Sequence, residues 1–450
     1  VWAMQPFHAA SDGRLLNVWW GAVFWPFVGG AWIMRASTIL ITTLGFAALT
    51  AFVRSSFSNA AAVVAGVIYS LLPFAVFFER MALADSFSPT AVLLLLVYSV
   101  RLAQRPHRRR WSVLAGCALA AAITVKISNL IFVPAPALAV LVFLRRTQRR
   151  HQIASALRGY LATGGILLPL YVVLHTVFGS DLGLDLLTSK TQSLSELVTQ
   201  FGVVGPIVWN YFWVLVTPPL LIAMLLCAAL AIVANVRVGL FVTLVLLPTL
   251  GVLIARTSVG FVEARFALVY LPMLVALGSG GAGWAATRLA QWGRAPALLA
   301  ALLGVALLAP TAGFTWAAWQ HPAALVLPDR DEWEYIRGWP SGYGFRELAA
   351  DLESEREAVR VSSLDLGSWQ KISAYLSLES SVTAEYHSAD EILAGAWPPP
   401  HAGRALLVLD HPRDDAEAAV LGLDPASAAR YLRPGGESWL GVYEFPSSQD

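Results

Sequence analysis

Charged side chains stand at one end of several long apolar runs, where they could hold an anion and move a proton. Asp85 precedes one run and Lys126 follows another, while Glu263 and Arg265 precede a third. A charge near hydrocarbon costs about 2.5–3.5 kcal/mol on insertion scales, so it usually serves a function. Arg and Lys hold phosphate, Arg through paired hydrogen bonds, and a carboxylate can remove a hydroxyl proton. The combination predicts a site for a phosphate tethered to a lipid, reached from the membrane plane.

Three further charges fall at the same predicted membrane surface. Glu79 and Arg80 follow the apolar run 59–78, and Arg35 precedes the run 34–53. Each arginine alone also fits an interfacial anchor or a salt-bridge partner, and Glu79 beside Arg80 also fits a solvated ion pair. Their occurrence on one side favours a shared site instead. Arg35 and Arg80 then add to phosphate binding, and Glu79 joins Glu263 as an acidic residue of the substrate site.

The elements that must position these side chains are membrane-spanning helices. The chain has 450 residues, 57% hydrophobic and 13% charged, whereas soluble domains carry about 25% charged residues. A helix needs about 20 apolar residues to cross the hydrocarbon. About ten candidate spans follow: 34–53, 59–78, 87–104, 112–127, 130–144, 159–178, 207–234, 238–255, 266–287 and 296–318. The pair 112–127 and 130–144 is short and predicts a tight helical hairpin with Lys126 at its tip.

Basic residues set the predicted orientation. One alternating set of loops carries fourteen of them, and the opposite loops carry five, or seven with Arg14 and Arg35. The positive-inside rule makes the first set cytoplasmic, which places both ends of the chain outside. We therefore expect a multi-pass protein of the cell (inner or plasma) membrane. Four glycines near the inner end of a late span predict close helix packing: Gly278, Gly280, Gly281 and Gly283.

Three parts are predicted along the chain. Residues 1–32 form an outer loop remnant whose Trp-rich stretch 14–32 suits an interfacial helix. Residues 33–319 form the transmembrane domain, and residues 320–450 form a soluble extracytoplasmic α/β domain. In that last part a helix is expected over 343–358, strands over 358–364, 405–410 and 439–445, and helices over 370–378 and 425–432. The fold class is an all-α polytopic membrane protein with a C-terminal extracytoplasmic α/β domain.

The run from Ser70 to Asp85, SLLPFAVFFERMALAD, resembles a span-and-loop signature of the GT-C membrane glycosyltransferases. It is most similar to their bacterial branch of dolichyl-phosphate-mannose protein mannosyltransferase-like and aminoarabinose transferase-like enzymes. Residues 121–126 (AAITVK), 263–266 (EARF) and 32–35 (WIMR) resemble further steps of that branch, and the similarity covers about residues 12–290.

The resemblance implies transfer of a sugar, with inversion, from a polyprenyl-phosphate donor to an extracytoplasmic lipid, glycan or protein acceptor. It implies that Arg265 and Lys126 bind the lipid phosphate, with Arg80 a weaker candidate, and that Asp85 shapes the sugar or acceptor site. The family's catalytic Asp lies in the first outer loop, after a first span that is absent here. Asp12 is the only carboxylate before the first predicted span, so it is the predicted base unless the base lies upstream of Val1.

Other functions are less well supported by the residues. Basic clusters lie in short loops without interleaved aromatics, so no nucleic-acid partner is predicted. The eight histidines are scattered and predict no metal site, although the sequence does not decide whether a divalent cation takes part. A transporter or flippase would place charges at mid-membrane in repeated halves, which the spans lack. An inactive scaffold would follow if the catalytic carboxylate were missing.

Overall fold

A computed structural model describes residues 15–24, 30–81, 83–144, 150–167, 169, 194–257, 262–338, 341–355, 358–376, 380–395, 397–398, 404–410 and 418–445. The chain divides into two compact units. One comprises Val1–Val23 with Arg35–Pro322, and the other comprises Phe24–Met34 with Ala323–Asp450. Asp12 and half of the predicted span 159–178 lie outside the described residues.

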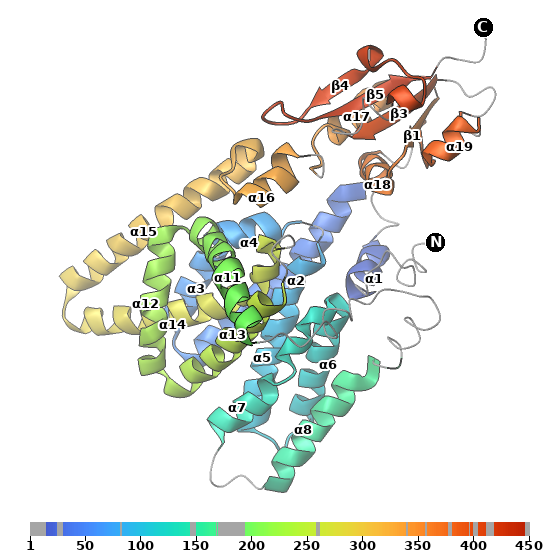
Figure 1. Cartoon of the computed structure of the whole chain (residues 1–450). Helices are drawn as coiled ribbons and strands as arrows, with labels where there is room; N and C mark the ends of the chain where they lie inside the picture. The colour runs from blue at the N-terminus through green and yellow to red at the C-terminus, as the bar shows by residue number, and fades with distance from the viewer. Residues whose placement is uncertain are drawn as a thin grey trace. The chain divides into compact units, whose positions relative to one another are not determined.

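The first unit is helical (Figure 1). Its helices are α1 (Leu15–Phe24), α2 (Gly30–Ser56, shared with the second unit), α3 (Asn59–Leu71), α4 (Pro73–Phe78), α5 (Ser88–Gln104), α6 (Arg109–Val125), α7 (Ala135–Phe143), α8 (Arg150–Gly164), α11 (Leu194–Val216), α12 (Pro218–Ala234), α13 (Val236–Arg256), α14 (Leu271–Gln291) and α15 (Arg294–Gln320). Within the described residues six helices are long and apolar enough to cross a membrane: 35–56, 84–104, 195–216, 236–256, 264–291 and 294–320. Shorter apolar helices cover 59–71, 127–143 and 218–234.

Two predicted spans are broken by proline. The span 59–78 divides at Leu72, which is extended, with Pro73 as the first residue of α4. The stretch 207–234 was expected to be one span and is two helices, which meet at Thr217, a non-glycine residue with a φ of 71°. Proline disfavours the helical conformation in the residue before it, so both breaks fall one residue ahead of a proline.

The predicted close packing of the four glycines is confirmed. A Cβ on Gly281 would overlap the carbonyl oxygen of Cys227 in α12, and one on Gly278 would lie 3.1 Å from Met224. On the other side of α14, a Cβ on Gly283 would lie 2.6 Å from Ala61 of α3. The glycines thus let α14 pack tightly against α12 and α3 at once, which makes α14 a central helix of the unit.

The second unit contains a five-stranded sheet in the order β2-β1-β3-β5-β4. The strands are β1 (Val359–Ser363), β2 (Thr383–Tyr386), β3 (Arg404–Asp410), β4 (Ala429–Leu432) and β5 (Trp439–Glu444). β1 is parallel to β2 and β3, whereas β5 is antiparallel to β3 and β4. The helices of this unit are α16 (Asp329–Glu332), α17 (Phe345–Ser354), α18 (Leu366–Tyr375) and α19 (Ala389–Leu393).

Alternating side chains of this sheet supply two apolar cores. Val359, Val361 and Val408 pack with α17 and α18 in one core, whereas Leu407 and Leu409 pack in the other with Trp397 and Tyr443. This α/β unit confirms the predicted fold class of the C-terminal part. One element was wrong: 425–432 is a single 3-10 turn (Pro425–Ser427) followed by β4, although Asp424 does cap the turn as expected.

Candidate functional site

Lys126 and Asp85 form an ion pair although they are 41 residues apart. The Lys126 Nζ lies 2.5 Å from the Asp85 Oδ1. Lys126 is the extended residue that ends α6, before a 3-10 segment over Ile127–Phe132. Asp85 lies in the 3-10 turn Ala84–Ser86 that precedes α5. α6 and α5 pack against each other, so the end of one helix meets the start of the other.

Arg265 and Glu263 complete a four-charge cluster with that pair. Glu263 precedes, and Arg265 lies within, the 3-10 segment Ala264–Tyr270 that leads into α14. The guanidinium contacts the Glu263 carboxylate, and its Nε lies 3.9 Å from the Asp85 Oδ2. The Lys126 Nζ also lies 4.0 Å from the ring centre of Phe266, a cation–π contact. The structure thus brings together four residues that the sequence predicted for one site.

Exposure separates the cations of this cluster from the carboxylates. The side chains of Lys126 and Arg265 are each 21% exposed, whereas those of Asp85 and Glu263 are 10% and 11% exposed. The carboxylates are buried, and the cations keep about twice as much of their surface exposed. A ligand that reaches the cluster therefore meets positive charge first.

Neutral polar residues hold the three 3-10 segments in place. The Ser86 hydroxyl donates to the Phe78 carbonyl at 2.7 Å. The Asn129 amide donates to the Ser88 hydroxyl and the Ala122 carbonyl, which ties the segment after Lys126 to α5 and α6. The Tyr211 hydroxyl of α11 donates to the carbonyl of Val262, the residue before Glu263. Sequence reasoning gave none of these residues a role in the site. Ser86 and Asn129 stand between two predicted spans, which was the only signal available, whereas Ser88 and Tyr211 lie inside predicted spans.

Glu79 lies apart from the four-charge cluster. It is buried, and its carboxylate accepts a hydrogen bond from the Tyr69 hydroxyl of α3. The solvated pair of Glu79 with Arg80 that the sequence also allowed is not formed, because burial leaves Glu79 8% exposed and its described partner is Tyr69. The break at Leu72 lets α4 fold back and bring the two residues together.

The two other predicted cations belong to other elements, since Arg80 follows α4 and Arg35 lies in α2. The Arg80 guanidinium donates to the Ala318 carbonyl near the end of α15, at 3.3 and 3.4 Å. Arg35 is exposed on α2. Asp12, the predicted base, lies outside the described residues. Within the described part of the chain, no three His, Cys, Asp or Glu residues come together as a metal site.

The cluster is suited to bind an anion and to move a proton. Its four formal charges cancel, so the resting cluster is neutral. An entering phosphate can take hydrogen bonds from the exposed faces of Lys126 and Arg265, which are stronger than those between neutral groups. If these cations turned toward a phosphate, the Asp85 carboxylate could accept a proton from a hydroxyl.

Comparisons with known proteins agree with this architecture. Residues 22–175 match the family model described as dolichyl-phosphate-mannose-protein mannosyltransferase. The fold is similar to that of ArnT from Cupriavidus metallidurans in the apo state, with a TM-score of 0.53 and 13% identity over 95% of this chain and 86% of that chain. ArnT bound to undecaprenyl phosphate gives a TM-score of 0.53 and 14% identity over 95% and 87% of the two chains.

A third solved structure, the apo oligosaccharyltransferase of Archaeoglobus fulgidus, covers 96% of this chain and 66% of its own, with 12% identity and a TM-score of 0.48. Among curated proteins, none matches this chain. The family match and the ArnT-like fold confirm the resemblance that the sequence motifs indicated.

Proposed function

We propose that this chain, a membrane glycosyltransferase of the GT-C class, transfers a sugar from a polyprenyl-phosphate carrier to an acceptor on the outer side of the membrane. The observation that carries the proposal is the four-charge cluster, in which two partly exposed cations pair with two buried carboxylates. The ArnT structure bound to undecaprenyl phosphate supports a polyprenyl phosphate as the carrier.

Lys126 and Arg265 are the proposed phosphate ligands. Both lie where a helix begins or ends, so their head groups sit near the predicted membrane surface, the depth of a lipid phosphate. When the bond between the anomeric carbon and the phosphate oxygen breaks, the phosphate leaves with the electron pair. Fixed cations stabilise this developing charge without reorganising. Arg80 and Arg35 are secondary candidates, because Arg80 already donates to a carbonyl and Arg35 is exposed.

A carboxylate is proposed to accept the proton of the acceptor hydroxyl as its oxygen attacks the anomeric carbon. Asp12 and Asp85 are the candidates for this base. Attack from the face opposite the phosphate inverts the anomeric centre. Of the two, Asp85 has a described position, in contact with the proposed phosphate ligands. Glu263, which contacts Arg265, orients that guanidinium, and Glu79 holds the end of α4 to α3 through its hydrogen bond with Tyr69.

The test is sugar transfer by the full chain in liposomes. Donors are polyprenyl-phosphate-linked hexoses and pentoses, acceptors are a panel of lipids, glycans and peptides, and the readouts are labelled product and released polyprenyl phosphate. Arg265→Ala should lower transfer about ten- to a hundredfold, the worth of a hydrogen bond to a charged group. Arg288→Ala is the matched control, since Arg288 lies at the other end of α14 and stacks on Trp284.

Undiminished transfer by Arg265→Ala would overturn the phosphate role. Solute flux through the liposomes with no sugar transfer from any donor would overturn the enzymatic class and favour a transporter.

A further inference from the structure

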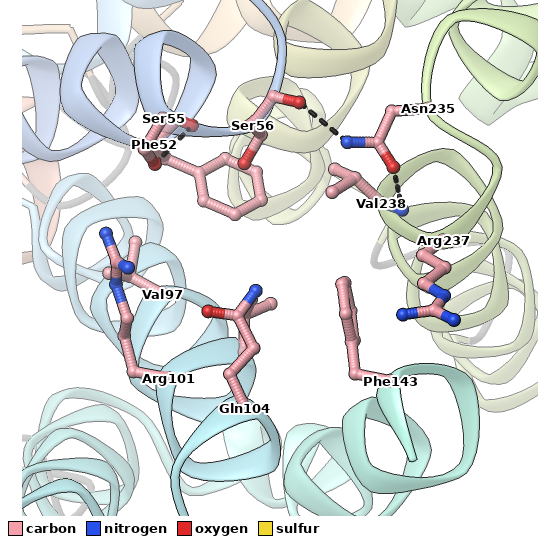
Figure 2. A pocket seen from close by; sticks show the side chains of 11 residues that line it. Phe52, Ser55, Ser56, Val97, Arg101, Gln104, Phe143, Asn235, Arg237 and Val238 are labelled. Carbon is pink, nitrogen blue, oxygen red and sulfur yellow. Dashed lines mark hydrogen bonds between the residues drawn. The ribbon is translucent and has the colours of Figure 1, made fainter. Parts of the chain in front are cut away.

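A second charged site lies in a pocket between the ends of α2, α5, α7 and α13 (Figure 2). Its volume is about 240 Å³. The polar or charged lining residues are Ser55, Ser56, Arg101, Gln104, Asn235 and Arg237. Apolar side chains, among them Phe52 and Phe143, form the rest of the wall. The pocket belongs entirely to the first unit.

The pocket carries positive charge that none of the described residues neutralises. Arg101 is half-buried on α5 and Arg237 is exposed at the start of α13. Among the residues that the structure describes, neither guanidinium forms an ion pair, and no acidic residue lines the pocket. Figure 2 shows the Gln104 amide between the two arginines. Two cations that share one cavity favour an anion within it.

Hydrogen bonds fix the shape of one wall. The Asn235 amide donates to the Ser56 carbonyl at 2.8 Å, and the Asn235 Oδ1 accepts from the Val238 backbone N–H at 3.3 Å. The same side chain therefore caps the start of α13 and ties it to the end of α2. Figure 2 shows both bonds at the rim of the cavity.

This pocket is distinct from the four-charge cluster. α5 begins next to Asp85 and carries Arg101 thirteen residues after its first residue, Ser88. At 1.5 Å per residue this separates the two sites by about 20 Å along the helix. α6 and α13 also run away from the pocket end, so the sites occupy opposite ends of one bundle. By the predicted orientation, the pocket is at the cytoplasmic surface.

We propose that this pocket binds the phosphate group of an anionic phospholipid of the cytoplasmic leaflet. Basic pockets between transmembrane helices on that side bind acidic head groups. The volume is below the range of about 300–1,000 Å³ typical of sites for whole small molecules, so it suits a head group rather than a nucleotide sugar. The apolar wall then receives the first carbons of the lipid, and a free phosphate ion would use the same cations.

The test compares three probes on the full chain in neutral detergent: dioleoylphosphatidylglycerol, dioleoylphosphatidylcholine and inorganic phosphate. Retained lipid is measured by native mass spectrometry and phosphate by equilibrium dialysis, at low and high ionic strength. The variant is Arg101→Gln with Arg237→Gln. The control is Arg109→Gln, because Arg109 begins α6, is exposed and does not line the pocket. Thermal unfolding of each variant checks that it is folded.

We expect the wild type to retain phosphatidylglycerol over phosphatidylcholine, and the double variant to bind it at least about tenfold more weakly, since hydrogen bonds to a charged group are lost. High salt should reduce the wild-type binding because exposed charges are screened. Binding of inorganic phosphate without a preference for phosphatidylglycerol would show that the pocket takes a free phosphate ion and would overturn the proposed lipid ligand. Equal phosphatidylglycerol binding by the wild type and a folded double variant would overturn the site itself. Neither result bears on sugar transfer, so the proposed function is tested separately.

Discussion

Replacing Asp85 with Asn should have opposite effects on phosphate binding and on catalysis. The change keeps the size of the side chain and removes its charge. The Lys126 Nζ loses an ionic partner at 2.5 Å and the Arg265 Nε loses one at 3.9 Å. The formal charge of the four-charge cluster then rises from zero to plus one. A polyprenyl phosphate no longer competes with Asp85 for the two cations.

The magnitude follows from the distances in the cluster. Two unit charges about 4 Å apart interact by about 4 kcal/mol at an effective dielectric constant of 20. The wild type does not incur the whole of this energy as a cost of phosphate binding, because the cations are partly exposed and can turn toward the phosphate. If phosphate binding to Asp85→Asn regains about a third of this interaction energy, the variant binds polyprenyl phosphate about 1.4 kcal/mol more tightly than the wild type, which is roughly tenfold. Transfer should fall by about 10²–10⁴ if Asp85 is the general base.

The assay measures both quantities on the same preparation. Binding of undecaprenyl phosphate is titrated in detergent, and transfer is measured at saturating donor so that tighter binding cannot mask slower chemistry. Asp329→Asn is the matched control, since this exposed residue of α16 undergoes the same change of carboxylate to amide outside the cluster.

Weaker phosphate binding by Asp85→Asn would refute the reasoning, because it would show that Asp85 holds the cations in their binding geometry rather than competing for them. Unchanged transfer would remove Asp85 from the chemistry and leave Asp12 as the candidate base.

Three further predictions concern stability. Gly281→Ala should destabilise the chain by about 1–3 kcal/mol through overpacking against α12. Gly304→Ala is the control, because a Cβ there meets open space, and it should be neutral or stabilising by up to about 1 kcal/mol. Equal melting temperatures of the two variants in detergent would contradict this prediction. Arg433→Met should weaken the second unit by about 1.5–3 kcal/mol, because the Asp410 carboxylate loses the fully buried guanidinium of Arg433 and keeps the Ser368 hydroxyl and Lys371 as partners. Slower or unchanged amide exchange in β3 would argue against it. Burial alone would raise the pKa of Asp365, but hydrogen bonds from the start of α18 lower it overall. The ionised Asp365 therefore stabilises the fold above the pKa that this group has in the unfolded chain, and this stabilisation is lost as the pH falls through its pKa in the folded chain. Asp365→Ser keeps a cap without a charge, and hydrogen exchange of α18 should therefore differ from wild type at neutral pH and converge in acid; a difference independent of pH would count against the charge.

The four-charge cluster could be anticipated because its signal is local. Asp85, Lys126 and Arg265 each stand next to a long apolar run, and a consistent assignment of alternate loops places them at one membrane surface. The helices then need only pack as neighbours for the side chains to meet. Which charges pair within the cluster was not readable, since it depends on three 3-10 segments whose ends are set by tertiary contacts.

The sequence did not predict the contacts of Glu79 and Arg80 or the structure of residues 425–432. Glu79 is bound by Tyr69 because α3 and α4 fold back at Leu72, and Arg80 meets a carbonyl 238 residues away. Neither partner is visible as a local pattern. In 425–432 the Asp-Pro start signal was correct for one turn, but the chain then pairs with β5, and sheet pairing overrode the local helix signal.

The length of α15 bears on how the protein meets membranes of different thickness. It has 27 residues, and Leu298, Leu299, Leu302 and Leu303 are each more than half exposed. At 1.5 Å per residue it is about 40 Å long, against about 30 Å of hydrocarbon. Because so little of α15 packs against the other helices, a thinner bilayer can be matched by tilting this one helix. The buried helices that carry the charged residues can then keep their register while the lipid around them varies.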